Sequence, residues 1–366
     1  MEMKAALFRV AHGPVTVESV EVDAPSGAEV LVRTVATGVC HSDLHMVDGA
    51  IRAPAQTAAV VLGHEGAGVV EAVGEDVTTV RVGDHVVACL SGFCGSCEQC
   101  LAGHPNLCVG GLVARRTVGT PRVRQDGQAL GQFGGIGSYA ERMLLHENSV
   151  VKIDPDLPLD SAALIGCGVL TGVGAALRTS GMEAGQTVAV FGCGGVGLSI
   201  VQGARIGGAR QIIAMDIFDG KLEMAKRLGA THTVNAATTD PVAAVRELTG
   251  GAGVDHAFEA VGNPTLVRQA VESLAIRGTA TIVGVPPAGT VFEIPFSAIR
   301  PECRVQTSRM GSNRFRIDIP RYLELYRQGR LLLDEMVSRR GRLEEINDAF
   351  RAMKAGEVAR TVLTFG

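Results

Sequence analysis

The chain has 366 residues, and its 34 basic and 38 acidic side chains are interspersed and give a net charge of −4. This length exceeds the size at which one hydrophobic core usually keeps growing, so two domains are expected. The balanced charge gives no electrostatic reason to expect a nucleic acid or an anionic membrane as partner. Because glycine is abundant at 47 residues and tryptophan is absent, the composition favours an α/β protein over a helical bundle or a β-sandwich.

The amino terminus predicts that the protein is not exported. Met1-Glu2-Met3-Lys4 is followed by Arg9 without an apolar signal core, so we expect a cytoplasmic location. Thiols stay reduced in that compartment. The nine cysteines are therefore expected to be metal ligands or buried side chains rather than disulfides.

The first half of the chain, up to about residue 155, consists of short β-rich segments broken by glycine. The clearest are residues 29–36, 66–73 and 84–88. An irregular, mostly β domain is predicted from them. The uncharged stretch that follows, residues 161–177, carries four glycines and is short for a membrane span. We interpret it as the start of a buried helix.

Four cysteines lie within fifteen residues of this half, with the spacing C-x2-C-x2-C-x7-C: Cys94, Cys97, Cys100 and Cys108. Zinc favours four thiolates at about 2.3 Å, and two-residue gaps let the backbone fold around one ion. An iron–sulfur cluster and a zinc ribbon that grips nucleic acid are the alternatives. Residues 86–110 contain no Lys or Arg, so a closed structural zinc site is the preferred interpretation.

In the second half the pattern changes to strand, glycine turn, helix and strand, which is typical of a parallel sheet. The predicted strands are residues 187–191, 211–215, 254–258 and 279–283, with a helix over 195–206. Beyond residue 308 we predict helices at 320–328 and 343–353 and a closing strand at 359–365.

The glycine turn has the sequence Gly192-Cys193-Gly194-Gly195-Val196-Gly197, between a predicted strand and a predicted helix. In that context it indicates dinucleotide binding, because its glycines let a pyrophosphate approach the helix N-terminus. Asp216 ends the next strand, where a carboxylate can accept hydrogen bonds from the adenosine ribose. It would repel a 2′-phosphate, so NAD is favoured over NADP.

A second set of metal-type residues is dispersed over residues 38–45, 63–66 and 166–168. Taken singly, a cysteine or histidine is more often a core residue than a ligand. Beside a nicotinamide-binding fold, however, Cys40, His64 and Cys167 would form a Cys2His zinc site whose fourth position stays open for water or substrate.

These motifs together resemble those of the liver-type, zinc-dependent alcohol dehydrogenases of the medium-chain dehydrogenase/reductase family. The resemblance covers essentially the whole chain and includes Thr171-Gly172 and the closing segment 360–365. It implies an α/β fold in which a GroES-like, mostly β catalytic domain (1–168 and 308–366) is interrupted by a Rossmann domain with a doubly wound parallel sheet (169–307). The active site is expected between the two domains.

The resemblance also implies catalytic roles. Cys40, His64 and Cys167 match the catalytic zinc ligands, and the four clustered cysteines match the structural zinc ligands. Asp43 matches the carboxylate that orients the histidine ligand, and Glu65 matches an acid beside the zinc. Ser42 matches the hydroxyl that hydrogen-bonds the substrate, and His45 matches the far end of a proton relay.

The implied cofactors are two zinc ions per chain and NAD. Thr171 and Val196 match residues on the nicotinamide face, Lys221 a residue near the adenosine ribose, and His41 and Arg360 pyrophosphate contacts. The full set of implied cofactor residues is His41, Thr171, Gly192, Gly194, Gly195, Val196, Gly197, Asp216, Lys221, Val283 and Arg360.

The implied reaction is reversible hydride transfer between NAD and a primary alcohol of the aromatic or longer-chain type. Ile51 and Leu90 are candidates for the substrate pocket. Glutathione-linked formaldehyde oxidation, an enzyme that keeps NAD bound, and a catalytically silent zinc protein are the alternatives. The 59 residues from Cys108 to Cys167 resemble those of longer, dimeric members, so a homodimer is expected. Arg115-Arg116 and residues 131–135 match no motif.

Overall fold

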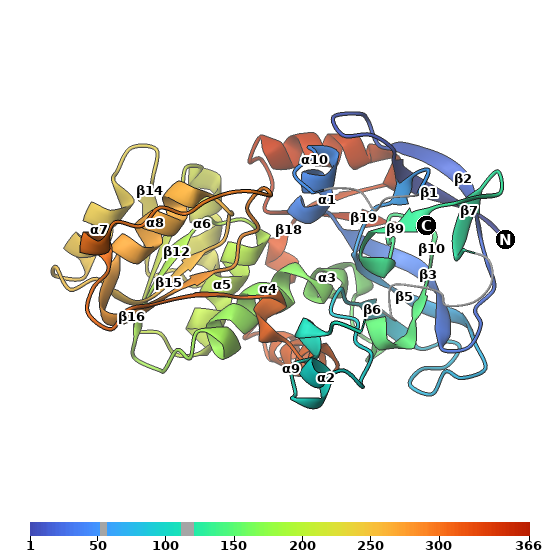
Figure 1. Ribbon diagram of the computed structural model, residues 1–366, viewed down its shortest axis with the longest axis horizontal. Coiled ribbons are helices and arrows are strands. Elements are labelled where there is room, and N and C mark those ends of the chain that lie inside the picture. Colours follow the sequence, from blue (N-terminus) through green and yellow to red (C-terminus); the bar gives the residue numbers. More distant parts are fainter. Residues whose placement is uncertain (52–56, 111–120) are drawn as a thin grey trace. The chain divides into compact units, whose positions relative to one another are not determined.

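The computed structural model describes residues 1–51, 57–110 and 121–366, which divide into two compact units. The first unit comprises Met1–Cys167, Arg314–Glu324 and Leu333–Gly366, and the second comprises Gly168–Asn313 and Leu325–Leu332. The mixed α/β architecture predicted from the sequence is present: the first unit is mostly β and the second holds a parallel sheet (Figure 1).

Two sheets form the first unit. One has the strand order β8-β7-β2-β1-β4-β9, and the other has the order β11-β6-β5-β3-β19-β18 with β10 also paired to β3. The strands are β1 (Glu2–Phe8), β2 (Thr16–Val22), β3 (Glu29–Gly38), β4 (Val60–Val61), β5 (Glu65–Val73), β6 (His85–Ala88), β7 (Val123–Gln125), β8 (Gln128–Ala129), β9 (Gly131–Gln132), β10 (Arg142–His146), β11 (Val150–Ile153), β18 (Val337–Gly341) and β19 (Arg360–Thr364).

The helices of the first unit lie at the ends of these strands. They are α1 (His41–Val47), α2 (Glu98–Leu101), α3 (Leu159–Ala163), the start of α9 (Phe315–Arg327) and α10 (Ile346–Lys354). Helix α10 covers one sheet with Ile346, Phe350 and Met353, which pack in one buried cluster with residues of β1 and β4. The last strand, β19, pairs antiparallel with β3, so segments far apart in the sequence share one sheet.

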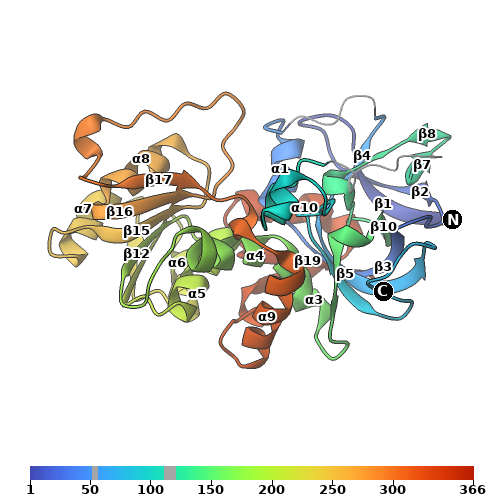
Figure 2. The ribbon, with the colours of Figure 1, turned by 60° about the horizontal axis from the view of Figure 1, so that its bottom comes forward.

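The second unit is a parallel sheet with the order β14-β13-β12-β15-β16-β17. Its strands are β12 (Thr187–Phe191), β13 (Gln211–Asp216), β14 (His232–Asn235), β15 (Val254–Glu259), β16 (Leu274–Ile282) and β17 (Arg304–Thr307); its helices are α4 (Gly168–Gly174), α5 (Gly195–Ile206), α6 (Asp219–Leu228), α7 (Pro241–Leu248) and α8 (Pro264–Glu272). The order runs outward from β12 in both directions, so the sheet is doubly wound, with helices on both faces (Figure 2).

Two predicted boundaries differ from the observed elements by five residues, more than any other. Helix α9 begins at Phe315 rather than at Pro320, because the Asp318 carboxylate accepts a hydrogen bond from the Arg314 N–H (2.7 Å) and caps an earlier turn. Strand β16 begins at Leu274 rather than at Thr279, since it starts pairing with Val254 before a bulge.

Within the described residues, no single helix is long and apolar enough to cross a membrane, although one bent helix pair, residues 159–166 and 168–179, meets the test of length and composition.

Candidate active site and metal centres

The dispersed metal-type residues meet where three strands of the first unit lie next to one another. Gly38, the last residue of β3, pairs with Glu65 at the start of β5 and with Val362 of β19. Cys40 lies two residues after the end of β3, and His64 directly precedes β5. The ligand atoms of Cys40, His64, Glu65 and Cys167 all lie within 4.8 Å of one another, and the four residues are buried.

A glycine with a positive φ shapes the turn that carries His64. Gly63 has φ +87°, and a Cβ there would lie 2.3 Å from Tyr139 Cδ1 and 2.6 Å from Ser138 Oγ. Its N–H donates to Asp43 Oδ1 at 2.8 Å. The other oxygen, Asp43 Oδ2, lies 3.1 Å from His64 Nδ1. The turn therefore sets the position of both the histidine and the carboxylate that faces it.

The residues present fit a zinc ion. By strict hydrogen-bond geometry, neither imidazole nitrogen of His64 has a partner among the described residues, although both are buried. Nδ1 faces Asp43 at 3.1 Å, which leaves Nε2 for a metal. Buried nitrogens without partners are costly, and two thiols with one imidazole are a donor set that zinc prefers.

The two thiols of this cluster have opposite proton affinities. The hydrogen bond from Cys167 and the charge of His64 hold the pKa of Cys40 well below its usual value, although burial opposes this. The same bond, with burial, raises the pKa of Cys167 well above its usual value. A divalent cation held by both sulfurs would bind them as thiolates, so its binding would release thiol protons.

Glu65 forms a buried ion pair with Arg360 at the edge of the cluster. Arg360 Nη2 donates to Glu65 Oε2, and the side chains are 4% and 0% exposed. Burial raises the pKa of Glu65 to about 7, against the lowering effect of the Arg360 charge. The structure thus places Arg360 beside the candidate metal site of the first unit, and its contact with a pyrophosphate remains a prediction.

Helix α1 carries the remaining catalytic candidates. Ser42 lies in its first turn, with Oγ 3.9 Å from Cys40 Sγ. The rings of His41 and His45 lie 6.4 Å apart in an edge-to-face arrangement. The turn after the helix closes onto it, because the Ile51 N–H donates to the His45 carbonyl at 3.1 Å. That Ser42 and His45 form a proton relay remains a prediction.

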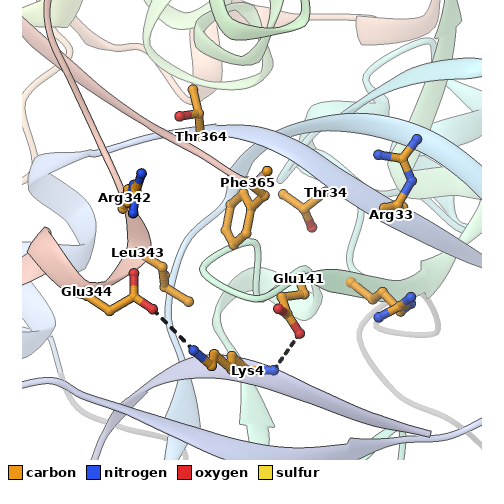
Figure 3. A pocket seen from close by; sticks show the side chains of 11 residues that line it. Lys4, Arg33, Thr34, Glu141, Arg342, Leu343, Glu344, Thr364 and Phe365 are labelled. Carbon is orange, nitrogen blue, oxygen red and sulfur yellow. Dashed lines mark hydrogen bonds and ion pairs between the residues drawn. The ribbon is translucent and has the colours of Figure 1, made fainter.

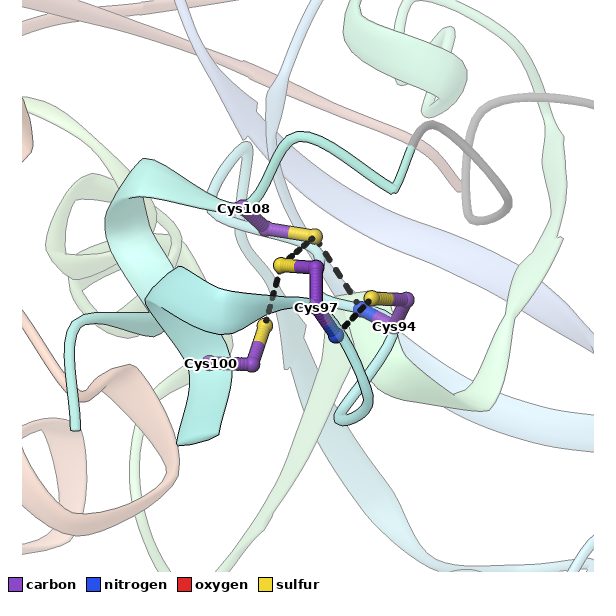
Figure 4. Close-up of side chains that lie close together, drawn as sticks. All are labelled: Cys94, Cys97, Cys100 and Cys108. Carbon is purple, nitrogen blue, oxygen red and sulfur yellow. Dashed lines mark hydrogen bonds between the residues drawn. The ribbon is translucent and has the colours of Figure 1, made fainter. Parts of the chain in front are cut away.

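The four clustered cysteines converge on one point in the lobe around α2 (Figure 4). Cys97 Sγ lies 3.5 Å from Cys100 Sγ and 3.9 Å from Cys108 Sγ. Backbone N–H groups also point at the sulfurs, from Cys94 to Cys108 Sγ at 3.2 Å and from Cys97 to Cys94 Sγ at 3.3 Å. Backbone N–H groups of Ser96 and Cys97 lower the pKa of Cys94 to about 6. These donors stabilise thiolates, as a metal site requires.

The remaining cysteines lie outside both clusters. Cys89 and Cys193 are buried, Cys303 is half-buried, and all nine cysteines are free of disulfides. Burial raises the pKa of Cys89 to about 12. A thiol of this kind is inert, which agrees with its interpretation as a packing residue.

The glycine turn of the second unit connects β12 to α5. Gly192 has φ +95°, and a Cβ on Gly197 would lie 1.8 Å from the Gly192 carbonyl oxygen. Gly194 is the N-cap of α5, followed by Gly195 in the first turn. A side chain at Gly192 or Gly197 would therefore disrupt the turn that leaves the N-terminal amides of α5 accessible.

Asp216 stabilises the backbone on both sides of this turn. Its Oδ2 accepts the Cys193 N–H at 2.8 Å, and its Oδ1 accepts the N–H groups of Ile217 and Phe218 at 2.8 and 3.1 Å. It lines a cavity of about 500 Å³ together with Gly192, Lys221 and Val261. The cavity lies at the carboxyl ends of β12 and β13, where open α/β sheets bind ligands.

The other predicted cofactor residues of the second unit lie near this end of the sheet. Thr171 in α4 is 7% exposed, and its hydroxyl donates to Met310 Sδ at 3.5 Å. Val196 lies in the first turn of α5. A Cβ added to Gly172 would lie 2.4 Å from the Val196 carbonyl oxygen. The Val283 N–H donates to the Glu259 carbonyl at 2.8 Å.

Two residues near His64 were not found from the sequence. The Phe133 ring lies 5.2 Å from the His64 ring, and Tyr139 Oη lies 3.0 Å from Asp43 Oδ2. Phe133 belongs to the segment 131–135 that matched no motif, and Tyr139 lies between β9 and β10 and belongs to none of the predicted motifs. Arg115-Arg116 lie outside the described residues.

A further cavity of the first unit, of about 680 Å³, contains none of the predicted site residues (Figure 3). Its charged groups form ion pairs: Lys4 with Glu344 of the same cavity at 3.6 Å, and both Arg33 and Arg142 with Glu71, which lies outside the lining.

The family models define the class of protein. Residues 26–155 match the alcohol dehydrogenase GroES-like domain, and residues 195–327 match the zinc-binding dehydrogenase domain. The chain therefore belongs to the zinc-dependent alcohol dehydrogenases of the medium-chain dehydrogenase/reductase family. The family resemblance and the predicted fold class, a GroES-like unit with a Rossmann unit, are confirmed.

Individual relatives match along the whole chain. It is 40% identical to S-(hydroxymethyl)glutathione dehydrogenase of Saccharomyces cerevisiae, over 98% of this chain and 95% of that one. It is also 40% identical to NDMA-dependent alcohol dehydrogenase of Amycolatopsis methanolica, over 99% of each. The crystal structure of benzyl alcohol dehydrogenase from Acinetobacter calcoaceticus is similar with a TM-score of 0.92 at 34% identity, over 100% of both chains.

Proposed function

We propose that the protein is an NAD- and zinc-dependent dehydrogenase that interconverts primary alcohols with apolar or aromatic side chains and their aldehydes. The observation that carries the proposal is the buried convergence of Cys40, His64 and Cys167. Three ligands are the number that a catalytic zinc uses when one position stays open, whereas the four cysteines of the α2 lobe would close a structural site.

The chain's own groups would handle the proton and the charge. A zinc ion held by Cys40, His64 and Cys167 would lower the pKa of a bound alcohol and polarise a carbonyl. Ser42, with its Oγ 3.9 Å from Cys40 Sγ, would accept the proton of that alcohol, and His45 on the same helix would carry it outward. NAD, when bound, would accept the hydride, which leaves the aldehyde.

NAD is the proposed cofactor because of Asp216. Its carboxylate lines the cavity at the end of β13 and is fixed there by three backbone N–H groups. A carboxylate in that position accepts hydrogen bonds from ribose hydroxyls and repels a 2′-phosphate.

The proposed substrate class rests on apolar side chains of the first unit. The Phe133 ring lies 5.2 Å from the His64 ring, and Ile51 and Phe133 each pack against the buried cluster that contains Phe350. Leu90 fills the space beside Gly134, because a Cβ added to Gly134 would lie 1.8 Å from Leu90 Cδ2. Such a surface favours an aromatic or aliphatic alcohol over the charged glutathione adduct that the yeast relative's name specifies.

The test is a substrate panel with NAD and NADP in parallel: benzyl alcohol, octanol, ethanol and S-(hydroxymethyl)glutathione. We expect the highest kcat/KM with benzyl alcohol or octanol and NAD. Activity confined to the glutathione adduct would overturn the substrate class. Mass spectrometry of NAD released from undialysed protein separates free exchange from a permanently bound cofactor.

The proposed quaternary state is a homodimer formed through β17. This strand ends the parallel sheet, so one of its sides has no strand partner among the described residues. Large apolar side chains are exposed on and near it: Val305 at 47%, Phe296 at 89% and Val291 at 72%. An unpaired edge with exposed apolar groups supports pairing with a second copy.

A further inference from the structure

Two groups donate hydrogen bonds to the carboxylate behind His64, and one of them is a tyrosine. Asp43 Oδ1 accepts the Gly63 N–H at 2.8 Å, whereas Oδ2 lies 3.1 Å from His64 Nδ1 and 3.0 Å from the Tyr139 hydroxyl. The hydroxyl is also 3.5 Å from the Gly38 carbonyl. It has one proton, and the shorter distance assigns that proton to Asp43.

The backbone fixes Tyr139 relative to His64. The Ser138 N–H donates to the Gly63 carbonyl at 3.0 Å, and the Tyr139 N–H donates to the Leu62 carbonyl at 2.9 Å. Segment 138–139 therefore pairs with segment 62–63, which directly precedes His64. The placement of the hydroxyl is part of the same backbone pairing that places the ligand.

The whole network is sealed from solvent. Asp43, His64 and Tyr139 are each 0% exposed, and the tyrosine ring packs against Phe350, with ring centres 6.5 Å apart. In such surroundings a hydrogen bond to a carboxylate is strong, and a hydroxyl without an acceptor is costly. The contact between Tyr139 and Asp43 is thus kept in one geometry.

We propose that Tyr139 is a positioning residue of the catalytic metal site, whose hydroxyl fixes the Asp43 carboxylate and thereby holds His64 with Nε2 toward the metal. The inference rests on the proposed function, because it takes Cys40, His64 and Cys167 as the ligands. The Gly63 N–H restrains only Oδ1, and the terminal torsion of an aspartate is broad. Tyr139 supplies the second restraint, on the oxygen that faces the imidazole.

Removing the hydroxyl should weaken the hold of this site on its metal. Groups that orient a metal-bound histidine typically change metal affinity by about 10–100-fold when they are lost. In Tyr139→Phe the ring and its packing remain, so we expect the catalytic zinc to transfer to a chelating dye about tenfold faster than in the unchanged protein. The zinc of the α2 lobe, whose ligands come from residues 94–108, should transfer at its original rate.

The experiment follows zinc transfer from the holoprotein, whose two metal sites serve as internal references for each other. A second readout is the absorption spectrum after cobalt replaces the catalytic zinc, because a reoriented imidazole shifts the cobalt bands without any reaction. Tyr322→Phe is the matched control: it removes a hydroxyl from another buried tyrosine (5% exposed) of the same unit. It should leave both transfer rates and the cobalt spectrum unchanged.

Three outcomes are decisive. Selective acceleration at one site with a shifted cobalt spectrum supports the inference. Equal acceleration at both sites, with a lowered melting temperature, would mean that Tyr139 only stabilises the fold. Unchanged zinc release from both sites would mean that Asp43 needs no second restraint. Either result overturns the inference. An unchanged protein that binds only the lobe zinc would instead contradict the proposed function. Tyr139→Leu, a second variant without the hydroxyl, is expected to show the same selectivity.

Discussion

Asp216 combines two tasks, since its oxygens accept three backbone N–H groups and its charge faces the cavity at the end of β13. For Asp216→Asn we expect the ratio of kcat/KM for NADP to that for NAD to rise about tenfold, because loss of a like charge near a phosphate is worth on the order of 1–2 kcal/mol. Initial rates with both cofactors measure the ratio.

The matched control for this change is Asp219→Asn. Asp219 begins α6 and accepts a hydrogen bond from Asn235 at 2.6 Å, so the variant removes one negative charge from the same region without altering the turn. If both variants change the ratio equally, general charge rather than Asp216 itself determines cofactor choice.

Among single site residues, those that belong to motifs could be predicted from the sequence. Cys40, His64 and Cys167 could be named because each stands in a recognisable short segment, and the structure brings them together. Tyr139 and Phe133 could not be named in this way. Their contacts with Asp43 and His64 depend on how segment 133–139 pairs with segment 62–63, and no local pattern encodes that register.

Among the elements, the lobe around α2 is the one that a metal has to hold together. Helix α2 spans only Glu98–Leu101, and none of its residues is buried, so it has no core of its own. We expect Cys100→Ser to lose the lobe zinc and to lower the melting temperature by several degrees, while turnover per remaining zinc is kept. Calorimetry and metal analysis test this.

Cys303→Ser is the comparison for the lobe variant, because it removes a half-buried thiol that lies outside both metal clusters. A Cys100→Ser protein with an unchanged melting temperature would contradict a stabilising role for the lobe metal.

Helix α9 is joined to the β part of the first unit through Glu147. Arg316 donates to the Glu147 carbonyl, and the Glu147 carboxylate accepts the N–H groups of Thr78 and Thr79 at 3.1 and 3.0 Å and the Thr79 hydroxyl at 2.7 Å. Burial opposes ionisation, but the hydrogen bonds from Thr79 and Thr78 and the charge of Arg316 hold the pKa of Glu147 below its usual value.

A lowered pKa in the folded state means that this carboxylate stabilises the fold above its unfolded pKa of about 4.3 and loses that effect as the pH falls through its folded pKa. Glu147→Gln should therefore lower the urea midpoint at pH 7, by an amount equivalent to about 1–2 kcal/mol, and less so near pH 3. A deficit that does not depend on pH would show that charge is unimportant there.

Element boundaries were predictable where one local signal governs them. Helix α5 begins and ends where its glycine turn and apolar pattern predict, at Gly195–Ile206. Helix α9 was misplaced because Pro320 is a favoured first residue of a helix. The Asp318 cap moves the start to Phe315 and leaves the proline inside the helix.

On the scale of the whole molecule, alternation of strands and helices was enough to predict the parallel sheet, but strand pairing in the mostly β unit was not predictable. Strand β10 pairs with β3 across more than a hundred residues of sequence, as Leu144 with Leu31. Such partners are selected by the complete fold rather than by a local pattern.

The proposed dimer gives the prediction for the assembled molecule. Val305→Asp with Phe296→Asp places charges on the exposed apolar face of the β17 edge, so we expect the dimer to dissociate into monomers at micromolar concentration. Sedimentation velocity measures the mass. Val82→Asp, which changes an exposed valine (62%) of the first unit, should leave the mass unchanged. A dimer that persists in the double variant would locate the interface elsewhere.

The two cysteine clusters differ in their access to solvent. All four cysteines of the lobe are partly exposed, whereas Cys40 and Cys167 are buried. Oxidants and competing soft metals such as cadmium therefore reach the lobe first. A preparation that ages in air should lose its resistance to heat while its specific activity is still intact, so an activity assay alone would overlook the first stage of damage.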